Sequence, residues 1–182
     1  MGLDMYLYKK TYVKNWSFQE PHEQFEVTVK KGGVTYPNIK SDRISYVEET
    51  VMYWRKANQI HGWFANNCSE KTPDVEYTLY TKQLQELLDT CKKVLGVLEK
   101  APKLVTQVNG GWKDGKPYEV DLEVYDCKDE IEDLLPPVQG FFFGSYEIDG
   151  WYKEQIEETV KFLEEELPNC SEDDTFTYYA SW

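Results

Sequence analysis

Alternation of apolar and polar residues marks both ends of the chain. In residues 3–8, Leu or Met at odd positions alternates with Asp or Tyr at even positions, and the pattern continues to about Val13. Residues 175–182 are rich in threonine and aromatic side chains. A period of two suits a strand with one buried face. Both ends are therefore predicted to be strands of the same sheet.

Three longer stretches carry helical signals. Ser45 and Glu48 fit a capping box, which predicts a helix from there to about Asn66. A second helix is predicted from Thr81 to before Pro102, with its apolar side formed by Leu84, Leu87, Leu88, Cys91, Val94, Leu95 and Leu98. A third follows Asp149, with Ile156, Val160, Leu163 and Leu167 on one side and glutamates on the other.

Shorter segments complete the predicted fold. Residues 25–29 and 35–36 flank the turn residues Gly32-Gly33, residues 76–80 read as a strand, and residues 104–108 and 119–125 form a hairpin around a glycine-rich loop. Residues 129–135 suit one helical turn, and Gly140–Ser145 reads as a buried strand or turn. The order predicts a single α+β domain over residues 1–182, with a mainly antiparallel sheet and three main helices.

Composition narrows the class of protein. With 41% hydrophobic and 15% aromatic residues, the chain has enough core formers to fold. No apolar run approaches the ~20 residues of a membrane span, and residues 1–4 lack the pattern of a signal peptide, so we expect a cytoplasmic protein. The four cysteines have no metal-binding spacing and are predicted to be reduced core residues, without metal or cofactor.

The negative charge is regional. The net charge is −13, yet residues 119–174 contain 19 Asp or Glu against 3 Lys, while the remainder contains 14 against 17 Lys or Arg. Phosphates would be repelled by the C-terminal third, so direct nucleic-acid binding is not expected. A small anionic ligand bound near the N-terminal half remains compatible with this distribution.

Four segments resemble a known family. They are MGLDMYLYKKTYVKNW, SYVEETVMYWRKANQIHGWF, GFFFGSYEIDGWY and the closing TYYASW. The resemblance is to a group of small proteins encoded by bacteriophages and prophages, and it spans the chain. Some members carry a phosphoglycerate kinase label, which this chain does not support because it is too short and has no phosphate-binding GxxxxGK[ST] loop. The resemblance implies a phage accessory protein that acts in the host cytoplasm, and it implies no catalytic residues.

The first candidate site lies on the first predicted helix. Helical spacing would place Trp54, Asn58 and His61 on one stripe with Arg55 beside it. A stacking plane, an amide, an imidazole and a cation suit a planar anionic ligand such as a nucleotide. The alternative is structural: Trp54 in the core, Asn58 and His61 bonded to backbone, and Arg55 paired with a surface carboxylate.

The second candidate site is the segment Gly140–Ser145. Its glycines allow close backbone approach, and Phe142, Gly144 and Ser145 precede the third helix, whose N-terminus attracts anions. The alternative is a buried segment, with Ser145 or Asp149 acting only as a helix cap. We expect Trp54, Arg55, Asn58 and His61 to approach this turn and to form a ligand pocket with it, within one chain or across a homo-oligomer.

The sequence gives little support for a catalytic site. No GxSxG elbow surrounds Ser145, and the carboxylates at 126–133 lack the spacing of a calcium loop, so they are interpreted as a solvated surface. Two functions remain. The first is a non-catalytic phage protein that sequesters a nucleotide-derived defence signal. The second is an acidic protein inhibitor that mimics nucleic acid and binds a host nuclease or CRISPR effector.

Overall fold

The central sheet brings the two ends of the chain together. The computed structural model describes residues 2–68, 76–171 and 174–182. Its largest sheet has the strand order β4-β1-β8-β5, formed by Tyr46–Arg55, Asp4–Tyr12, Thr175–Ser181 and Glu76–Leu79, with antiparallel neighbours throughout. β1 and β8 are the two central strands, and Asp4 pairs with Ser181. The prediction that both ends belong to one sheet is confirmed.

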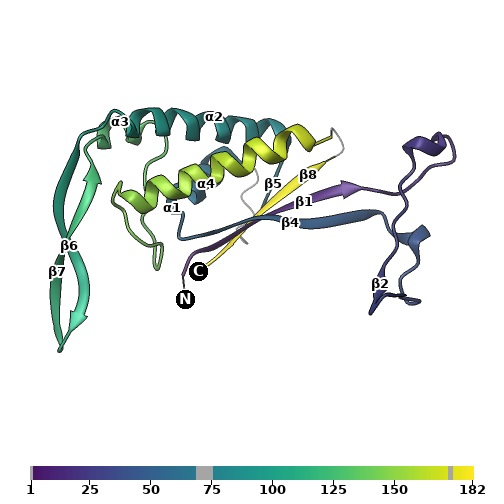
Figure 1. Cartoon of the computed structure of the whole chain (residues 1–182), viewed down its shortest axis with the longest axis horizontal. Coiled ribbons are helices and arrows are strands. Elements are labelled where there is room, and N and C mark those ends of the chain that lie inside the picture. Colours follow the sequence, from purple (N-terminus) through teal and green to yellow (C-terminus); the bar gives the residue numbers. More distant parts are fainter. Residues whose placement is uncertain (1, 69–75, 172–173) are drawn as a thin grey trace.

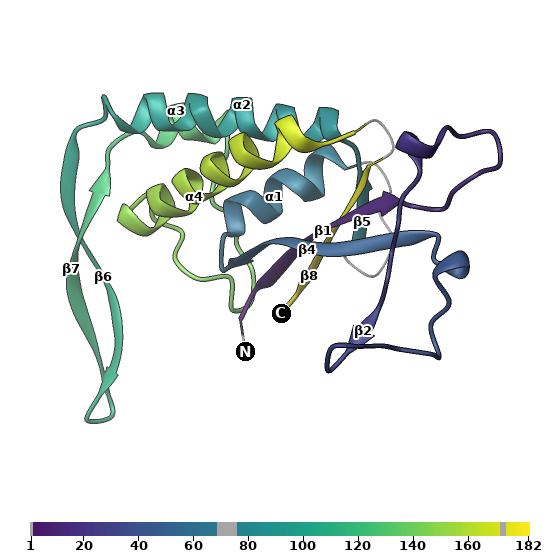
Figure 2. The same cartoon turned by 45° about the vertical axis from the view of Figure 1, so that its right-hand side comes forward.

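The helices cover one face of this sheet. They are α1 (Asn58–Asn67), α2 (Thr81–Leu98), the short α3 (Lys128–Glu132) and α4 (Gly150–Glu166). Figures 1 and 2 show α1, α2 and α4 on the same side of the strands. Leu3, just before β1, and Met5 and Leu7 within β1 are fully buried in the core beneath these helices, as the alternating pattern predicts. The predicted α+β class, with mainly antiparallel pairing and three main helices, is confirmed.

One predicted helix is wrong over its first half. Residues 46–55 form strand β4, and helix α1 begins only at Asn58. The segment Tyr46–Arg55 is rich in β-branched and aromatic residues, which pack well on a pleated surface and lose rotamer freedom in a helix. The match of Ser45 and Glu48 to a capping box therefore does not mark the start of a helix. Lys56, with φ of 57°, makes the turn between the strand and the helix.

The face of the sheet opposite the helices is rich in tyrosine. Tyr6 lies at the centre, with its ring centroid 6.1 Å from Tyr8, 5.1 Å from Tyr53 and 6.3 Å from Tyr179. Tyr53 is 45% exposed and Tyr179 is 38% exposed. These four residues form an aromatic cluster in which the Tyr6 ring is nearly parallel to Tyr8 and tilted against Tyr53 and Tyr179.

Two extensions leave this core at opposite ends (Figure 1). One is the hairpin of β6 (Lys103–Lys113) and β7 (Lys116–Tyr125), which turns at Asp114-Gly115 with the left-handed φ values of 52° and 74° that a tight hairpin turn requires. The other is residues 14–45, with the small β2–β3 hairpin (Lys30–Lys31, Val34–Thr35) and two 3-10 turns (Pro21–Glu23, Ser41–Arg43), none of whose residues is buried. Both predicted hairpin turns are confirmed, but the strand predicted at residues 25–29 is wrong, because the first hairpin pairs only Lys30–Lys31 with Val34–Thr35.

The remaining connection, Gly140–Ser145, is a turn rather than a buried strand. Phe143 is buried, whereas Phe141 and Phe142 are 77% and 43% exposed. The third predicted helix is confirmed as α4, and Asp149 caps it by accepting a hydrogen bond from the Tyr152 amide at 2.9 Å. Among the described helices, none combines the length and the apolar character required to cross a bilayer.

Candidate functional site

The seven predicted site residues do not share one surface. Trp54 and Arg55 are consecutive residues of β4, so their side chains point to opposite faces of the sheet. Trp54 is 3% exposed and donates from Nε1 to Thr159 Oγ1 of α4 at 2.8 Å. Arg55 lies on the face opposite the helices, where its guanidinium is 3.6 Å from the Asp4 carboxylate. The helical stripe that would have joined both residues to Asn58 and His61 is therefore wrong.

Asn58 does reach the Gly140–Ser145 turn. Its Nδ2 donates to the backbone oxygens of Phe143 at 3.2 Å and Ser145 at 2.8 Å, and its Oδ1 accepts from the Val138 amide at 2.9 Å. The side chain is 2% exposed. Because its donors and its acceptor are all engaged by backbone, Asn58 holds the turn against the start of α1.

His61 also approaches the turn, but as part of an aromatic cluster. Its Nδ1 lies 2.8 Å from the Tyr178 hydroxyl, and its ring meets Phe143 at 5.3 Å and Trp182 at 5.5 Å between centroids. Burial lowers the pKa of the imidazole, which favours the neutral form at neutral pH. The structural alternative thus describes Trp54, Arg55 and Asn58, while His61 bonds to a side chain rather than to backbone.

The turn itself is conformationally unusual. Phe142 has φ of 67° and Gly144 has φ of 98°. A Cβ at Gly144 would lie 3.1 Å from the Lys56 side chain, so glycine allows that close approach. Ser145 Oγ accepts from the Glu147 amide at 3.1 Å, which stabilises the chain ahead of α4. These residues hold β4, α1 and the turn together.

The space between these groups is small. The cavity bordered by Lys56, Asn58, Ser145 and Asp149 has a volume of about 10 Å³. One water molecule needs about that much room. In addition, none of the buried side-chain nitrogen or oxygen atoms in the described residues lacks a hydrogen-bond partner. Within one chain, the convergence of Asn58, His61 and the turn is a packed junction with no room for a nucleotide.

Gly62 gives a direct test of this junction. Helix propensity alone predicts that Gly62→Ala in α1 stabilises the protein by about 1 kcal/mol. However, a Cβ at Gly62 would lie 2.4 Å from Val138 Cγ2, a stiff β-branched side chain. We expect Gly62→Ala to lower the free energy of unfolding by about 1–3 kcal/mol instead, measured by urea denaturation.

The matched control is Gly96→Ala in α2, where a Cβ would have no neighbour within 4 Å. This change is expected to raise stability by up to about 1 kcal/mol. The double variant Gly62→Ala/Val138→Ala should recover part of the loss, because the shorter side chain at 138 removes the contact. Stabilisation by Gly62→Ala alone would contradict the close packing of the turn on α1.

The larger concave regions lie elsewhere. A groove of about 600 Å³ runs between the base of the β6–β7 hairpin and the body, with Leu104, Val124, Ile131, Pro137, Tyr146 and Ile148 among its apolar residues. Asp126, Glu132 and Glu147 line it together with a single lysine, Lys128. This charge balance suits a cationic or apolar partner better than an anionic ligand. Sequence analysis did not identify this groove, because it depends on how the hairpin joins the body.

The hairpin has two chemically distinct faces. In its register, Leu104 pairs with Val124, Thr106 with Leu122 and Val108 with Val120. We define the apolar face as Leu104, Thr106, Val108, Tyr118, Val120, Leu122 and Val124. On the opposite side, Glu119, Asp121 and Glu123 are exposed at alternate positions of β7, and we call them the acidic row. The alternation in residues 118–124 was the sequence signal for this row.

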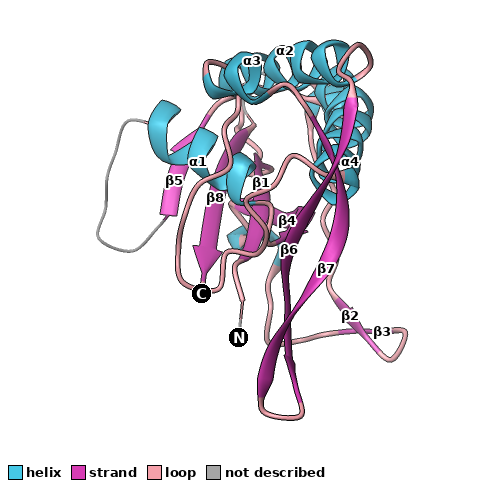
Figure 3. Cartoon of the chain, turned by 90° about the vertical axis from the view of Figure 1, so that its left-hand side faces the viewer, coloured by secondary structure: helices cyan, strands magenta, loops and turns pink. Residues whose placement is uncertain are grey.

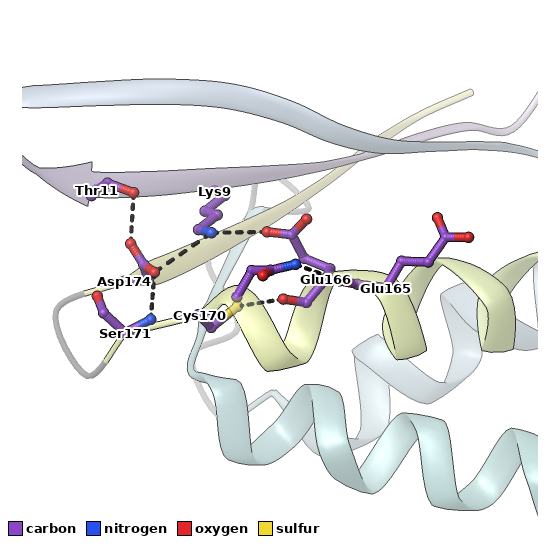
Figure 4. A network of polar contacts seen from close by, with 8 residues as sticks. Lys9, Thr11, Glu165, Glu166, Cys170, Ser171 and Asp174 are labelled. Carbon is purple, nitrogen blue, oxygen red and sulfur yellow. Dashed lines mark hydrogen bonds and ion pairs between the residues drawn. The ribbon is translucent and has the colours of Figure 1, made fainter.

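A buried ion cluster connects β1 to the end of α4 (Figure 4). The Lys9 ammonium is 2.8 Å from Glu166 Oε1 and 3.6 Å from Asp174 Oδ2, and Asp174 also accepts from Thr11 at 2.6 Å and from the Ser171 amide at 2.8 Å. Burial opposes the charge of Lys9, but its hydrogen bond to Glu166 and the neighbouring negative groups outweigh this and raise its pKa. A lysine held so firmly in its charged form is a structural ion-pair partner rather than a nucleophile.

The cysteine thiols are also disfavoured as nucleophiles, because raised pKa values keep them protonated. Burial raises the pKa of Cys68 to about 11 and that of Cys91 to about 12. Cys127 and Cys170 have raised pKa values as well, chiefly through burial. All four are unpaired thiols. In the described ranges, no group of three His, Cys, Asp or Glu side chains is arranged to bind a metal ion.

Comparisons with protein families, curated proteins and solved structures find no match for this chain. The resemblance to phage proteins therefore stays a prediction.

Proposed function

We propose that this protein acts without turnover by binding another protein, and that the acidic row occupies a cationic surface that otherwise contacts nucleic acid. The main observation in support is the position of Glu119, Asp121 and Glu123 on the β6–β7 hairpin, an arm that extends from the body (Figure 3). A row of carboxylates on a projecting arm can enter a groove that a flat acidic surface could not.

The geometry of the row supports this proposal. Alternate residues of a strand lie about 6.8 Å apart, so the three carboxylates form a regular line of charge. Within the row, the Glu123 carboxylate pairs with the Lys103 ammonium at 2.6 Å. Helix α4 carries further exposed carboxylates at Glu157, Glu158, Glu164 and Glu165. Such charge steers a basic partner and sets orientation more than it sets affinity.

The resemblance to phage proteins gives the reason to seek the partner among host nucleases and CRISPR effectors. The alternative function, sequestration of a nucleotide-derived signal, loses support from the junction at Asn58, where the cavity holds about 10 Å³. Native mass spectrometry of the freshly purified protein separates the two functions. Our proposal expects the mass of the protein without a bound small molecule, and a co-purifying nucleotide would favour sequestration.

The proposal predicts displacement of nucleic acid from its binding protein. We expect the wild-type protein to release labelled duplex DNA from a susceptible host nuclease or CRISPR effector in a competition assay. The triple variant Glu119→Gln, Asp121→Asn, Glu123→Gln neutralises the acidic row and should raise the half-inhibitory concentration at least tenfold. Potency should also fall as salt rises, because exposed charges are screened within about 8 Å at physiological ionic strength.

The matched control removes the same number of carboxylates from α2 and its C-terminal end, through Glu86→Gln, Asp89→Asn and Glu99→Gln, all at exposed positions. This variant should inhibit as well as the wild type. A second set, Glu157→Gln, Glu158→Gln, Glu164→Gln and Glu165→Gln, measures the part played by α4. Equal loss in the hairpin and α2 variants would reduce the effect to net charge and contradict the role of the acidic row.

A further inference from the structure

Much of the apolar face of the β6–β7 hairpin is exposed to solvent in the described part of the chain. At its base, Leu104 and Val124 border the groove beside the body. Even there Leu104 is 50% exposed, and further along the arm Tyr118 is 42% and Val120 is 40% exposed. A two-stranded hairpin is only marginally stable in water unless one face packs against another element. The arm therefore carries apolar residues in the alternating pattern of a buried surface, while much of that surface stays solvated.

The side chains on this face fit one another closely. Tyr118 lies across Gly110, where a Cβ would come within 2.4 Å of the tyrosine ring and 2.8 Å of Val120 Cγ1. The absence of a Cβ at Gly110 therefore leaves room for the side chains of both Tyr118 and Val120 on this face.

We propose that the apolar face is covered by the same face of a second copy of this chain, in a two-fold dimer. Self-association of a chain with net charge −13 requires a surface without like-charge repulsion. None of the seven residues of the apolar face is charged. A two-fold contact joins identical patches, so an uncharged apolar patch is self-complementary.

The size of the face suits a weak dimer. The apolar face runs along β6 from Leu104 to Gly111, eight residues that span about 27 Å at 3.4 Å per residue. A contact of this length is smaller than the roughly 800 Å² per partner of a standard interface and falls in the size range of weak, transient association.

The dimer leaves the acidic row outside. Because Glu119, Asp121 and Glu123 point to the opposite side of the hairpin, face-to-face packing keeps them in solvent. Each dimer would then present two acidic rows. The inference does not depend on the proposed function, since it concerns the other side of the arm.

Sedimentation velocity over about 2–200 µM tests the dimer. For the wild type we expect a concentration-dependent rise from the 21.5 kDa of one chain toward twice that mass. Val120→Lys places one lysine on each side of the two-fold contact and should raise the dimer dissociation constant at least tenfold. Val105→Lys is the control, because Val105 is 70% exposed on the opposite side of the same hairpin, paired with Glu123.

A third variant, Val120→Thr, keeps the β-branched shape and so preserves the strand while removing apolar surface. It should weaken the dimer in the same direction as Val120→Lys, and far-UV circular dichroism confirms that each variant is folded. A wild type that stays monomeric overturns the proposal and leaves the face to a different protein. An equal loss of dimer in Val105→Lys and Val120→Lys also overturns it.

Discussion

Deleting Thr175–Trp182 is expected to abolish cooperative folding. β8 lies between β1 and β5, so its removal leaves β5 at the end of the order β4-β1-β8-β5 without its strand partner and leaves β1 paired only with β4. It also removes Phe176, Tyr178 and Ala180 from the core, all of them at most 3% exposed. We expect the truncated chain to lose the sigmoidal urea transition, followed by far-UV circular dichroism. An unchanged melting temperature would contradict the central position of β8.

A deletion in the hairpin is the matched control. Joining Thr106 to Leu122 through an Asn-Gly turn removes residues 107–121, more residues than the first deletion, from an arm that projects from the core. We expect a change in melting temperature of no more than a few degrees. The contrast separates the structural role of a central strand from that of an extension.

Replacing Lys9 with methionine is expected to destabilise the protein strongly for a single substitution. The change leaves Asp174, which is 4% exposed, without its cation and weakens the link between β1 and α4. Breaking a buried ion pair by removing one partner costs about 3–5 kcal/mol, and the partial exposure of Glu166 favours the lower end. For a chain of this size, that corresponds to a fall of roughly 6–12 °C in melting temperature.

Lys92→Met is the control, because the Lys92–Glu164 pair has a similar distance of 2.7 Å but both side chains are about half exposed. Its removal should cost less than about 1 kcal/mol. If both variants lose the same amount, burial is not the reason for the effect of Lys9.

The same cluster gives an acid dependence. Burial opposes the charge of Asp174, but hydrogen bonds from Thr11 and Ser171 and the Lys9 ammonium outweigh it and lower the pKa below its usual value of 3.8. A lowered pKa in the folded state means that this stability is present above about pH 4 and is lost as the pH falls through the folded-state pKa. Asp174→Asn should therefore reduce the dependence of stability on pH below about 4, measured by urea denaturation across the acid range.

The sequence predicted elements best where one residue pattern had one interpretation. The alternation in residues 3–8 indicated the correct strand, and the turn pairs Gly32-Gly33 and Asp114-Gly115 indicated the correct hairpin turns, since each pattern fits only one local geometry. Segment 46–55 was ambiguous, because a helix-start signal preceded residues that favour a strand. Its position beside β1 decided the outcome, and that neighbour is distant in the sequence.

The candidate site was predictable only in part. Asn58 and His61 were correctly expected to approach the Gly140–Ser145 turn. The role of these contacts could not be predicted from the sequence. An asparagine whose amide binds a ligand cannot be distinguished in sequence from one whose amide binds backbone, since the difference depends on where the turn lies in the fold. Trp54 and Arg55 were misplaced because a change from helix to strand moves adjacent side chains to opposite faces.

The pairing of β1 with β8 also sets when this protein can fold during synthesis. β1 is translated long before β8, one of its two neighbours, because residues 13–174 lie between the two strands in the sequence. At about 5–20 residues per second, the nascent chain carries an unpaired strand edge for on the order of 10 s or longer. The acidic residues added in the meantime, along residues 119–174, give the unfinished chain a negative charge that disfavours aggregation until β8 arrives.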